Sequence, residues 1–98
     1  DFTYVGDVVE ANILAALHPE KHKGDVFNIG NGKEFTVNEL ADMFGGEKQY
    51  GNKVIEPFRT LADNSKANLI LGWEPKGDLP SWIKEYKNVL QQIKYEYL

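Results

Sequence analysis

Residues 60–73, TLADNSKANLILGW, contain the start, body and end of one short helix, and the rest of the chain is interpreted around them. Asp63 can accept hydrogen bonds from the free N–H groups of the turn that follows, as an N-cap residue does. Apolar residues at three- and four-residue spacing form one face of this helix: Ala67, Ile70 and Leu71. Gly72 supplies the left-handed conformation that ends a helix, and the residue before Pro75 is disfavoured in a helix. The stretch therefore predicts a short, packed helix with Trp73 over its end.

Three further helices are predicted on either side of this stretch. Residues 7–10 (DVVE) form a capping box with Asp7 at the N-cap. The helix that follows ends near His18-Pro19, and its apolar face consists of Val9, Ile13, Ala16 and Leu17. Residues 36–39 (TVNE) form a second capping box, and the helix that follows ends at Gly45-Gly46. Residues 78–81 (DLPS) begin the last helix, in which apolar residues at helical spacing continue to Tyr97.

Alternating or continuous apolar residues predict short strands in three other segments. Residues 2–5 (FTYV) alternate, residues 25–30 (DVFNIG) are apolar on both faces, and residues 49–55 form a weaker strand that Gly51-Asn52 interrupts. We therefore expect an α+β fold of three to four helices and two to three short strands. At 98 residues, the chain is expected to form one domain, spanning residues 1–98.

The composition excludes several classes of function. The net charge of −4 argues against a nucleic-acid surface, and residues 21–23 (KHK), the one tight basic cluster, are interpreted as a solvated loop. Cysteine is absent, which excludes disulfides and thiolate metal sites and suits a reducing cytoplasm. No apolar run is long enough to span a bilayer. The chain begins at Asp1 within a predicted strand, so we expect it to be a piece of a longer protein.

The sequence does not predict a catalytic, cofactor-binding or metal-binding residue. Residues 30–32 (GNG) contain only two glycines and lead to a threonine cap, so a plain turn is favoured over a dinucleotide site. His18 and His22 are four residues apart, but Pro19 between them breaks the helix that would bring them together, which favours loop histidines over a metal site. The acidic residues that could act in proton transfer are interpreted as helix caps: Asp7, Glu10 and Glu39.

Arg59 and Phe58 are the candidate substrate-binding residues. The planar fork of Arg59 suits a phosphate group, and the alternative is a surface arginine near the cap of the central helix. Phe58 has the flat ring to stack on a base or sugar, and the alternative is a core aromatic. Trp73 is interpreted as a packing residue and Lys66 as a solvated helix residue.

Four segments in order resemble the C-terminal part of the NAD-dependent nucleotide-sugar epimerases and dehydratases, which are extended short-chain dehydrogenases/reductases of the UDP-glucose 4-epimerase type. Residues 1–9 (DFTYVGDVV) resemble the family's R-D-F-x-Y-V-x-D-V-V. Residues 25–30 with 35–37 (FTV) resemble its Y-N-I-G…S-V-x-E-L stretch. Residues 60–67 (TLADNSKA) and 71–75 (LGWEP) resemble its T-x-A-D-x-S-K-A and L-G-W-x-P motifs.

The resemblance implies that the NAD-binding Rossmann domain and the catalytic Tyr-x-x-x-Lys pair of such a protein precede Asp1. The 98-residue chain alone is then a substrate-binding fragment that binds no cofactor itself and is inactive, while the parent enzyme uses NAD and a nucleotide-diphosphate sugar. The family's P-x-R-x-G-D segment carries an arginine that touches the diphosphate. Pro57-x-Arg59 matches its first half, but Thr60 follows at once and the G-D portion is missing.

A second hypothesis is a non-enzymatic interaction module derived from the same family. In the family, the strand that corresponds to Val26–Ile29 joins the Rossmann sheet, and the helix that begins at Asp7 packs beside it. Without that sheet, apolar faces of both segments should be open to water, and we expect the chain to self-associate, or to swap an element, to cover them.

Overall fold

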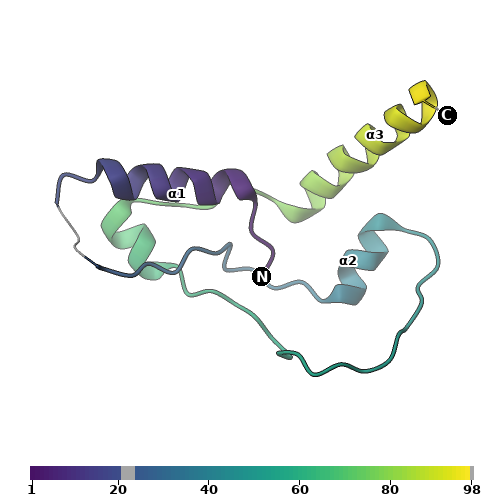
Figure 1. The fold of residues 1–98 in the computed structure, drawn as a ribbon, viewed down its shortest axis with the longest axis horizontal. Coiled ribbons are helices and arrows are strands. Elements are labelled where there is room, and N and C mark those ends of the chain that lie inside the picture. The colour runs from purple at the N-terminus through teal and green to yellow at the C-terminus, as the bar shows by residue number, and fades with distance from the viewer. Residues whose placement is uncertain (21–23, 98) are drawn as a thin grey trace. The chain divides into compact units, whose positions relative to one another are not determined.

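The computed structural model describes residues 1–20 and 24–97, and their regular structure is entirely helical (Figure 1). The elements are helix α1 (Val5–Leu17), helix α2 (Val37–Phe44), the π-helix η1 (Ala67–Leu71) and helix α3 (Leu79–Tyr97). The chain divides into two units. The first contains Asp1–Glu34 and Arg59–Gly77, and the second contains Phe35–Phe58 and Asp78–Leu98. None of the described helices is long and apolar enough to cross a membrane.

The predicted α+β class is wrong, because no strand forms in the described ranges. Val5, expected at the end of a strand, is the first residue of α1, and residues 25–30 and 49–55 lack regular structure. A strand exists only where a neighbouring strand completes its hydrogen-bond ladder. An apolar pattern in the sequence indicates that a segment could form a strand, but it does not indicate whether a neighbouring strand is present to pair with it.

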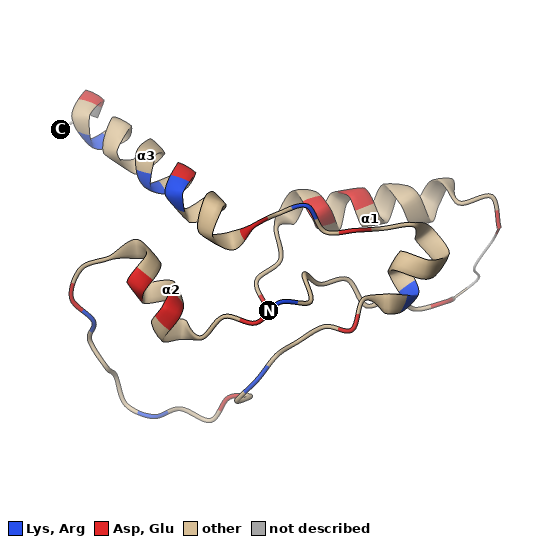
Figure 2. Ribbon diagram, turned by 180° about the vertical axis from the view of Figure 1, so that it is seen from behind, with Lys and Arg blue, Asp and Glu red and all other residues tan. Residues whose placement is uncertain are grey.

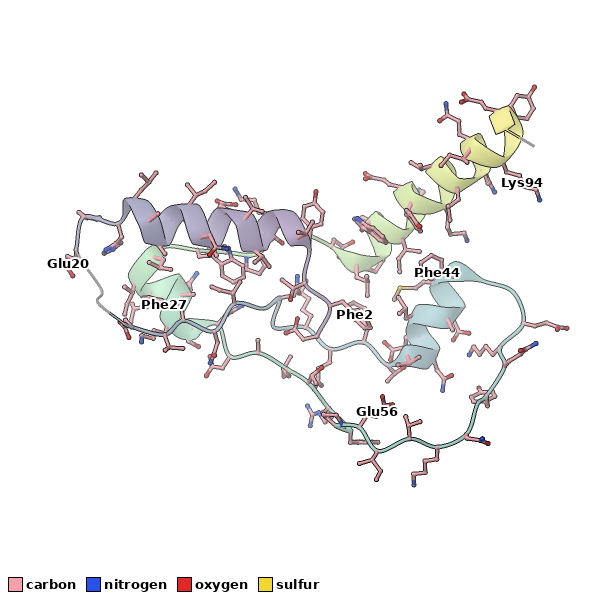
Figure 3. The ribbon with its side chains drawn as sticks, viewed as in Figure 1. Phe2, Glu20, Phe27, Phe44, Glu56 and Lys94 are labelled. Atoms are coloured by element: carbon pink, nitrogen blue, oxygen red, sulfur yellow. The ribbon has the colours of Figure 1, made fainter. Side chains whose placement is uncertain are left out.

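The core of the first unit lies where α1 meets η1. Its buried residues are Ala11 of α1, Ala67 and Leu71 of η1, and Trp73. Partly buried apolar side chains pack around them: Leu14, Phe27, Ile29 and Ile70. Figure 3 shows Phe27 beside η1. Trp73 has 0% of its surface exposed, and its Nε1 donates to the backbone oxygen of Asp7 at 2.8 Å, so its predicted packing role is confirmed.

η1 ends at the glycine that the sequence indicated, and Asp63 binds the turn that precedes the helix, although the N-cap position of η1 itself is Lys66, without a side-chain hydrogen bond. Asp63 accepts hydrogen bonds from the backbone N–H of Ser65 at 3.0 Å and from the Ser65 hydroxyl. Gly72 is left-handed, with φ of 66°, and its N–H donates to the Asn68 oxygen at 3.0 Å. The structure thus confirms the glycine end of η1 and the hydrogen bond from the turn after Asp63.

The predicted capping box at Asp7 and Glu10 is wrong. α1 begins at Val5, and Tyr4 occupies the cap position without a side-chain hydrogen bond. Asp7 is instead buried inside the first turn, where its carboxylate accepts from the backbone N–H groups of Lys76 at 3.1 Å and Gly77 at 2.8 Å. Glu10 lies 3.6 Å from the Lys76 ammonium. The acidic pair therefore holds a distant segment against α1.

The second unit consists of α2, α3 and the loop between residues 45 and 58. The predicted caps at Thr36 and Asp78 are confirmed, because Thr36 accepts from the Glu39 N–H at 3.0 Å and Asp78 accepts from the Ser81 N–H at 3.1 Å, whereas the capping role of the Glu39 carboxylate stays a prediction. Aromatic rings join the two helices: Tyr86 meets Phe44 edge-on at 6.3 Å between centroids and stacks on Trp82 at 4.8 Å.

An apolar face of α1 is open to solvent, as the sequence predicted for a chain without the family's sheet. Four side chains at four-residue spacing, here called the α1 stripe, are each at least half exposed: Val5, Val9, Ile13 and Leu17. Figure 2 shows acidic but no basic segments on α1, and its acids are Asp7 and Glu10, which bind residues 76 and 77. Because the four residues of the stripe are all aliphatic, the stripe itself carries no charge.

Candidate functional site: the pocket at Arg59

Arg59 is the single arginine of the sequence, and the structure places it at a shallow pocket of the first unit. The pocket is lined by Asp1, Thr3, Ile29, Gly30, Arg59, Thr60, Leu61 and Ala62. Its walls thus come from three segments that lie far apart in the sequence. A guanidinium at the edge of such a hollow can bind a phosphate or a carboxylate through two parallel hydrogen bonds.

The carboxylate of Asp1 holds these three segments together. Its Oδ1 accepts from the Asn31 N–H at 3.0 Å and from the Thr3 hydroxyl at 2.9 Å. Its Oδ2 accepts from the Gly32 N–H at 2.9 Å and the Ala62 N–H at 3.1 Å. Because carboxylate hydrogen bonds are stronger than neutral ones, this one side chain fixes both the turn and the segment that carries Arg59.

Close backbone packing completes the frame of the pocket. Asn64 Nδ2 donates to the Gly30 oxygen at 2.9 Å. A Cβ at Gly30 would lie 2.3 Å from the Ala62 Cβ, so only glycine allows the turn to approach this closely. The pocket backbone is thus held by side-chain hydrogen bonds in place of a sheet.

Glu34 faces Arg59 and forms a bidentate ion pair with it. Arg59 Nε lies 2.6 Å from Glu34 Oε1, and Arg59 Nη2 lies 2.7 Å from Oε2. The side chains are 66% and 38% exposed, so the pair sits at the surface. The hydrogen bond from Arg59 lowers the pKa of Glu34 below its usual 4.5, and the same bond raises the pKa of Arg59.

Phe58 does not line this pocket, and its 99% exposure excludes the alternative of a core aromatic. An exposed ring is available for stacking on a flat ligand, which stays a prediction.

The glycine turn at residues 30–32 does not fit a dinucleotide phosphate. The amide groups of Asn31 and Gly32 donate to the Asp1 carboxylate, which already occupies the anion position of the turn. α2 begins only at Val37, so no helix N-terminus lies directly after the glycines. The interpretation as a plain turn agrees with this geometry.

The histidine and basic-cluster predictions fall partly outside the described residues. Residues 21–23, which include His22, are not described. His18 Nδ1 lies 3.2 Å from the Glu20 nitrogen. Among the residues that the structure describes, no group of three or more His, Cys, Asp or Glu side chains is arranged to hold a metal ion.

Lys66 is an exposed helical residue, as its interpretation as a solvated residue predicts, but it also has specific partners. Its ammonium pairs with Asp25, donates to the Val26 oxygen at 2.8 Å and lies 4.8 Å from the centre of the Phe27 ring. Lys66 therefore attaches the extended segment at residues 25–27 to the helix end.

Comparison with known proteins finds relatives that share most of this chain. A Methanocaldococcus jannaschii protein provisionally named UDP-glucose 4-epimerase is 40% identical over 90% of the chain and 30% of its own length. The UDP-glucose 4-epimerase of Halalkalibacterium halodurans is 36% identical over 78% of the chain and 25% of its own length. UDP-glucuronic acid decarboxylase 1 of Arabidopsis thaliana is 36% identical over 89% of the chain and 22% of its own length.

The chain thus spans between a fifth and a third of the length of these curated relatives, and the matched part is C-terminal. No protein-family model matches the chain, and no solved structure matches it.

Proposed function

The chain belongs to the NAD-dependent nucleotide-sugar epimerase and dehydratase family, and from this premise we propose that residues 1–98 are its substrate-binding C-terminal portion. The observation that carries the proposal is the 40% identity to the M. jannaschii protein over 90% of the chain. The position of Arg59 at the rim of a pocket adds chemical support.

The proposed ligand is a nucleotide-diphosphate sugar. Arg59 binds the diphosphate through its planar fork, and Phe58 stacks on the base or the sugar. The proposed parent enzyme is cytoplasmic, in keeping with the absence of cysteine. In that parent, NAD oxidises the sugar and returns the hydride after epimerisation or loss of water. We propose that the cofactor site lies elsewhere in the parent, and the glycine turn of this chain, whose amides bind Asp1, does not offer one.

A binding measurement on the 98-residue chain tests this proposal. We expect UDP to bind in isothermal titration calorimetry and the Arg59→Gln variant to bind at least about tenfold more weakly, because a hydrogen bond to a charged group contributes roughly 1.5–3 kcal/mol. Lys53→Gln removes the same charge from an exposed loop residue and should leave the affinity unchanged. Equal affinities of the Arg59 and Lys53 variants would refute the assignment of Arg59.

A second measurement tests whether the catalytic activity resides in this chain or in the rest of the parent enzyme. We expect no turnover when NAD and UDP- or dTDP-sugars are added to the chain. Conversion of any of these sugars by the chain alone would refute the proposal that catalysis resides elsewhere.

The α1 stripe favours a second candidate function, a module that associates with itself. Its four apolar side chains are exposed and carry no charge, so two copies can meet there across a twofold axis without electrostatic repulsion. Substrate binding and self-association are separated by their sites: Arg59 substitutions affect the first, and stripe substitutions affect the second.

A further inference from the structure

We propose that Glu34 is a specificity-determining residue. It competes with the ligand for the donors of Arg59, and only an anion that carries several negative charges displaces it. The inference rests on the proposed function, in which Arg59 binds a diphosphate. Glu34 has no assigned role in that function, and it was not among the residues that the sequence singled out.

The contact between the two side chains occupies the same donors that a phosphate would use. A guanidinium has five N–H donors, and the Nε–Nη2 edge matches a pair of anionic oxygens. Both Glu34 oxygens lie on this edge, at 2.6 Å from Nε and 2.7 Å from Nη2. An incoming phosphate oxygen pair must therefore displace Glu34 or bind the remaining edge beside a negative charge.

The frame of the pocket keeps the competitor in place. Asp1 fixes the Asn31 and Gly32 amides just before Glu34. It also fixes the segment after Arg59, through the Ala62 N–H and through its own backbone nitrogen, which donates to the Thr60 oxygen at 2.7 Å. Since one residue positions both partners, the Glu34 carboxylate stays near Arg59 at a high effective concentration whether or not a ligand is present.

This arrangement discriminates between anions by their charge. A ligand with one carboxylate can only replace the contact that Glu34 already makes, so it gains little. An exposed ion pair is weak, because both charges are well solvated. A diphosphate, with more charge and more oxygens, can therefore displace Glu34. The expected ligand class is di- or triphosphate esters, in preference to monocarboxylates.

The single arginine gives a direct readout of this competition. The Nε–Hε signal of Arg59 is unique in the proton–nitrogen NMR spectrum of the 98-residue chain and can be followed during titration with sodium pyrophosphate or sodium acetate at constant ionic strength. In Glu34→Gln we expect half-saturation by pyrophosphate at about threefold lower concentration than in the wild type. Acetate should scarcely move the wild-type signal but should shift that of Glu34→Gln, so that the preference for pyrophosphate falls.

Two control variants separate competition from general effects. Glu85→Gln makes the same change in net charge on an exposed residue of α3 and should leave the titration unchanged. Glu34→Asp keeps a carboxylate and should retain most of the preference for pyrophosphate. An unchanged backbone spectrum shows that each variant keeps the fold.

The outcomes distinguish this inference from the proposed function. Saturable binding of pyrophosphate with the same or weaker affinity in Glu34→Gln overturns the role of Glu34 and leaves Arg59 as the anion ligand. A signal that pyrophosphate moves in neither protein overturns both proposals.

Discussion

Trp73 is the largest side chain in the core of the first unit, and it also forms a buried hydrogen bond. Its Nε1 donates to the Asp7 oxygen, which belongs to the helix across the core. Phenylalanine keeps most of the apolar volume but leaves that oxygen without this donor. We expect Trp73→Phe to lower the free energy of unfolding by about 1–3 kcal/mol. Urea denaturation followed by circular dichroism measures the change.

The chain supplies a matched control for this substitution in its other tryptophan. Trp82 is 42% exposed and stacks on Tyr86, so Trp82→Phe removes no buried hydrogen bond and should cost less than about 1 kcal/mol. If both variants lose the same stability, the Trp73–Asp7 hydrogen bond contributes nothing beyond ring packing.

Asp63 illustrates how hydrogen bonds in a turn change the titration of a carboxyl group. The hydrogen bond from the Ser65 hydroxyl, and then the one from the Ser65 N–H, lower the pKa of Asp63 below its ordinary 3.8. A carboxyl with a lowered folded-state pKa stabilises the fold above its unfolded pKa, and this contribution is lost as the pH falls through the folded value. We expect Ser65→Ala to move the pKa of Asp63 part of the way back toward 3.8, as carbon NMR of the side-chain carboxyl can measure. A titration curve that the substitution leaves in place would contradict this account of the cap.

Among the elements, the helix ends set by local chemistry could be predicted and the longer-range features could not. The caps of α2 and α3, the Asp63 turn before η1 and the glycine end of η1 involve residues two to four apart in the sequence, so their side-chain and glycine signals are readable. The start of α1 was misplaced because Asp7 binds the amides of residues 76 and 77, far along the chain. The predicted strands failed because a sheet needs a partner that an apolar pattern does not reveal.

At the candidate site, too, the sequence predicted local features but not contacts between distant residues. Arg59 was identified from its residue type and its position after Pro57. Glu34 was not, because the ion pair spans 25 residues and no local pattern marks it. Asp1 stood in a family-like motif, yet its contacts reach Ala62, 61 residues away. The chemistry of single residues thus predicts candidate ligand-binding side chains, whereas the fold determines which other side chains contact them.

The C-terminal end of η1 gives a prediction at the scale of an element. Gly72 has φ of 66°, a conformation that costs a residue with a side chain roughly 1–2 kcal/mol. We expect Gly72→Ala to destabilise the chain by about that amount in thermal or urea unfolding. Gly51 is not left-handed, and a methyl group at its Cα would meet no atom within 4 Å, so Gly51→Ala should be nearly neutral or slightly stabilising. A neutral Gly72→Ala would mean that η1 can end without the left-handed turn.

At the scale of the whole molecule, the buried apolar residues are few for a chain of this length. Those of the described part of the chain are Ala11, Ala67, Leu71, Trp73 and Ile83. Many large apolar side chains are exposed, the α1 stripe among them. Since stability depends mainly on apolar burial, a chain of this kind gains much from any surface that covers its open faces.

The α1 stripe is the face on which this gain can be tested. If two copies meet there, the sedimentation coefficient of the chain should rise with protein concentration. Val9→Asp places a charge in the middle of the stripe. It should weaken association by at least about tenfold, because burying a valine side chain contributes roughly 1.5 kcal/mol. Analytical ultracentrifugation of both proteins measures the effect.

The matched control is Asn52→Asp, which adds the same charge to an exposed residue of the second unit and leaves the stripe intact. It should sediment as the wild type does, since the added charge lies outside the contact. A wild type that remains monomeric at every concentration rules out self-association through the stripe. If both variants weaken the association equally, the effect is due to the added net charge. A contact through the apolar stripe would instead be weakened only when the aspartate is placed within the stripe.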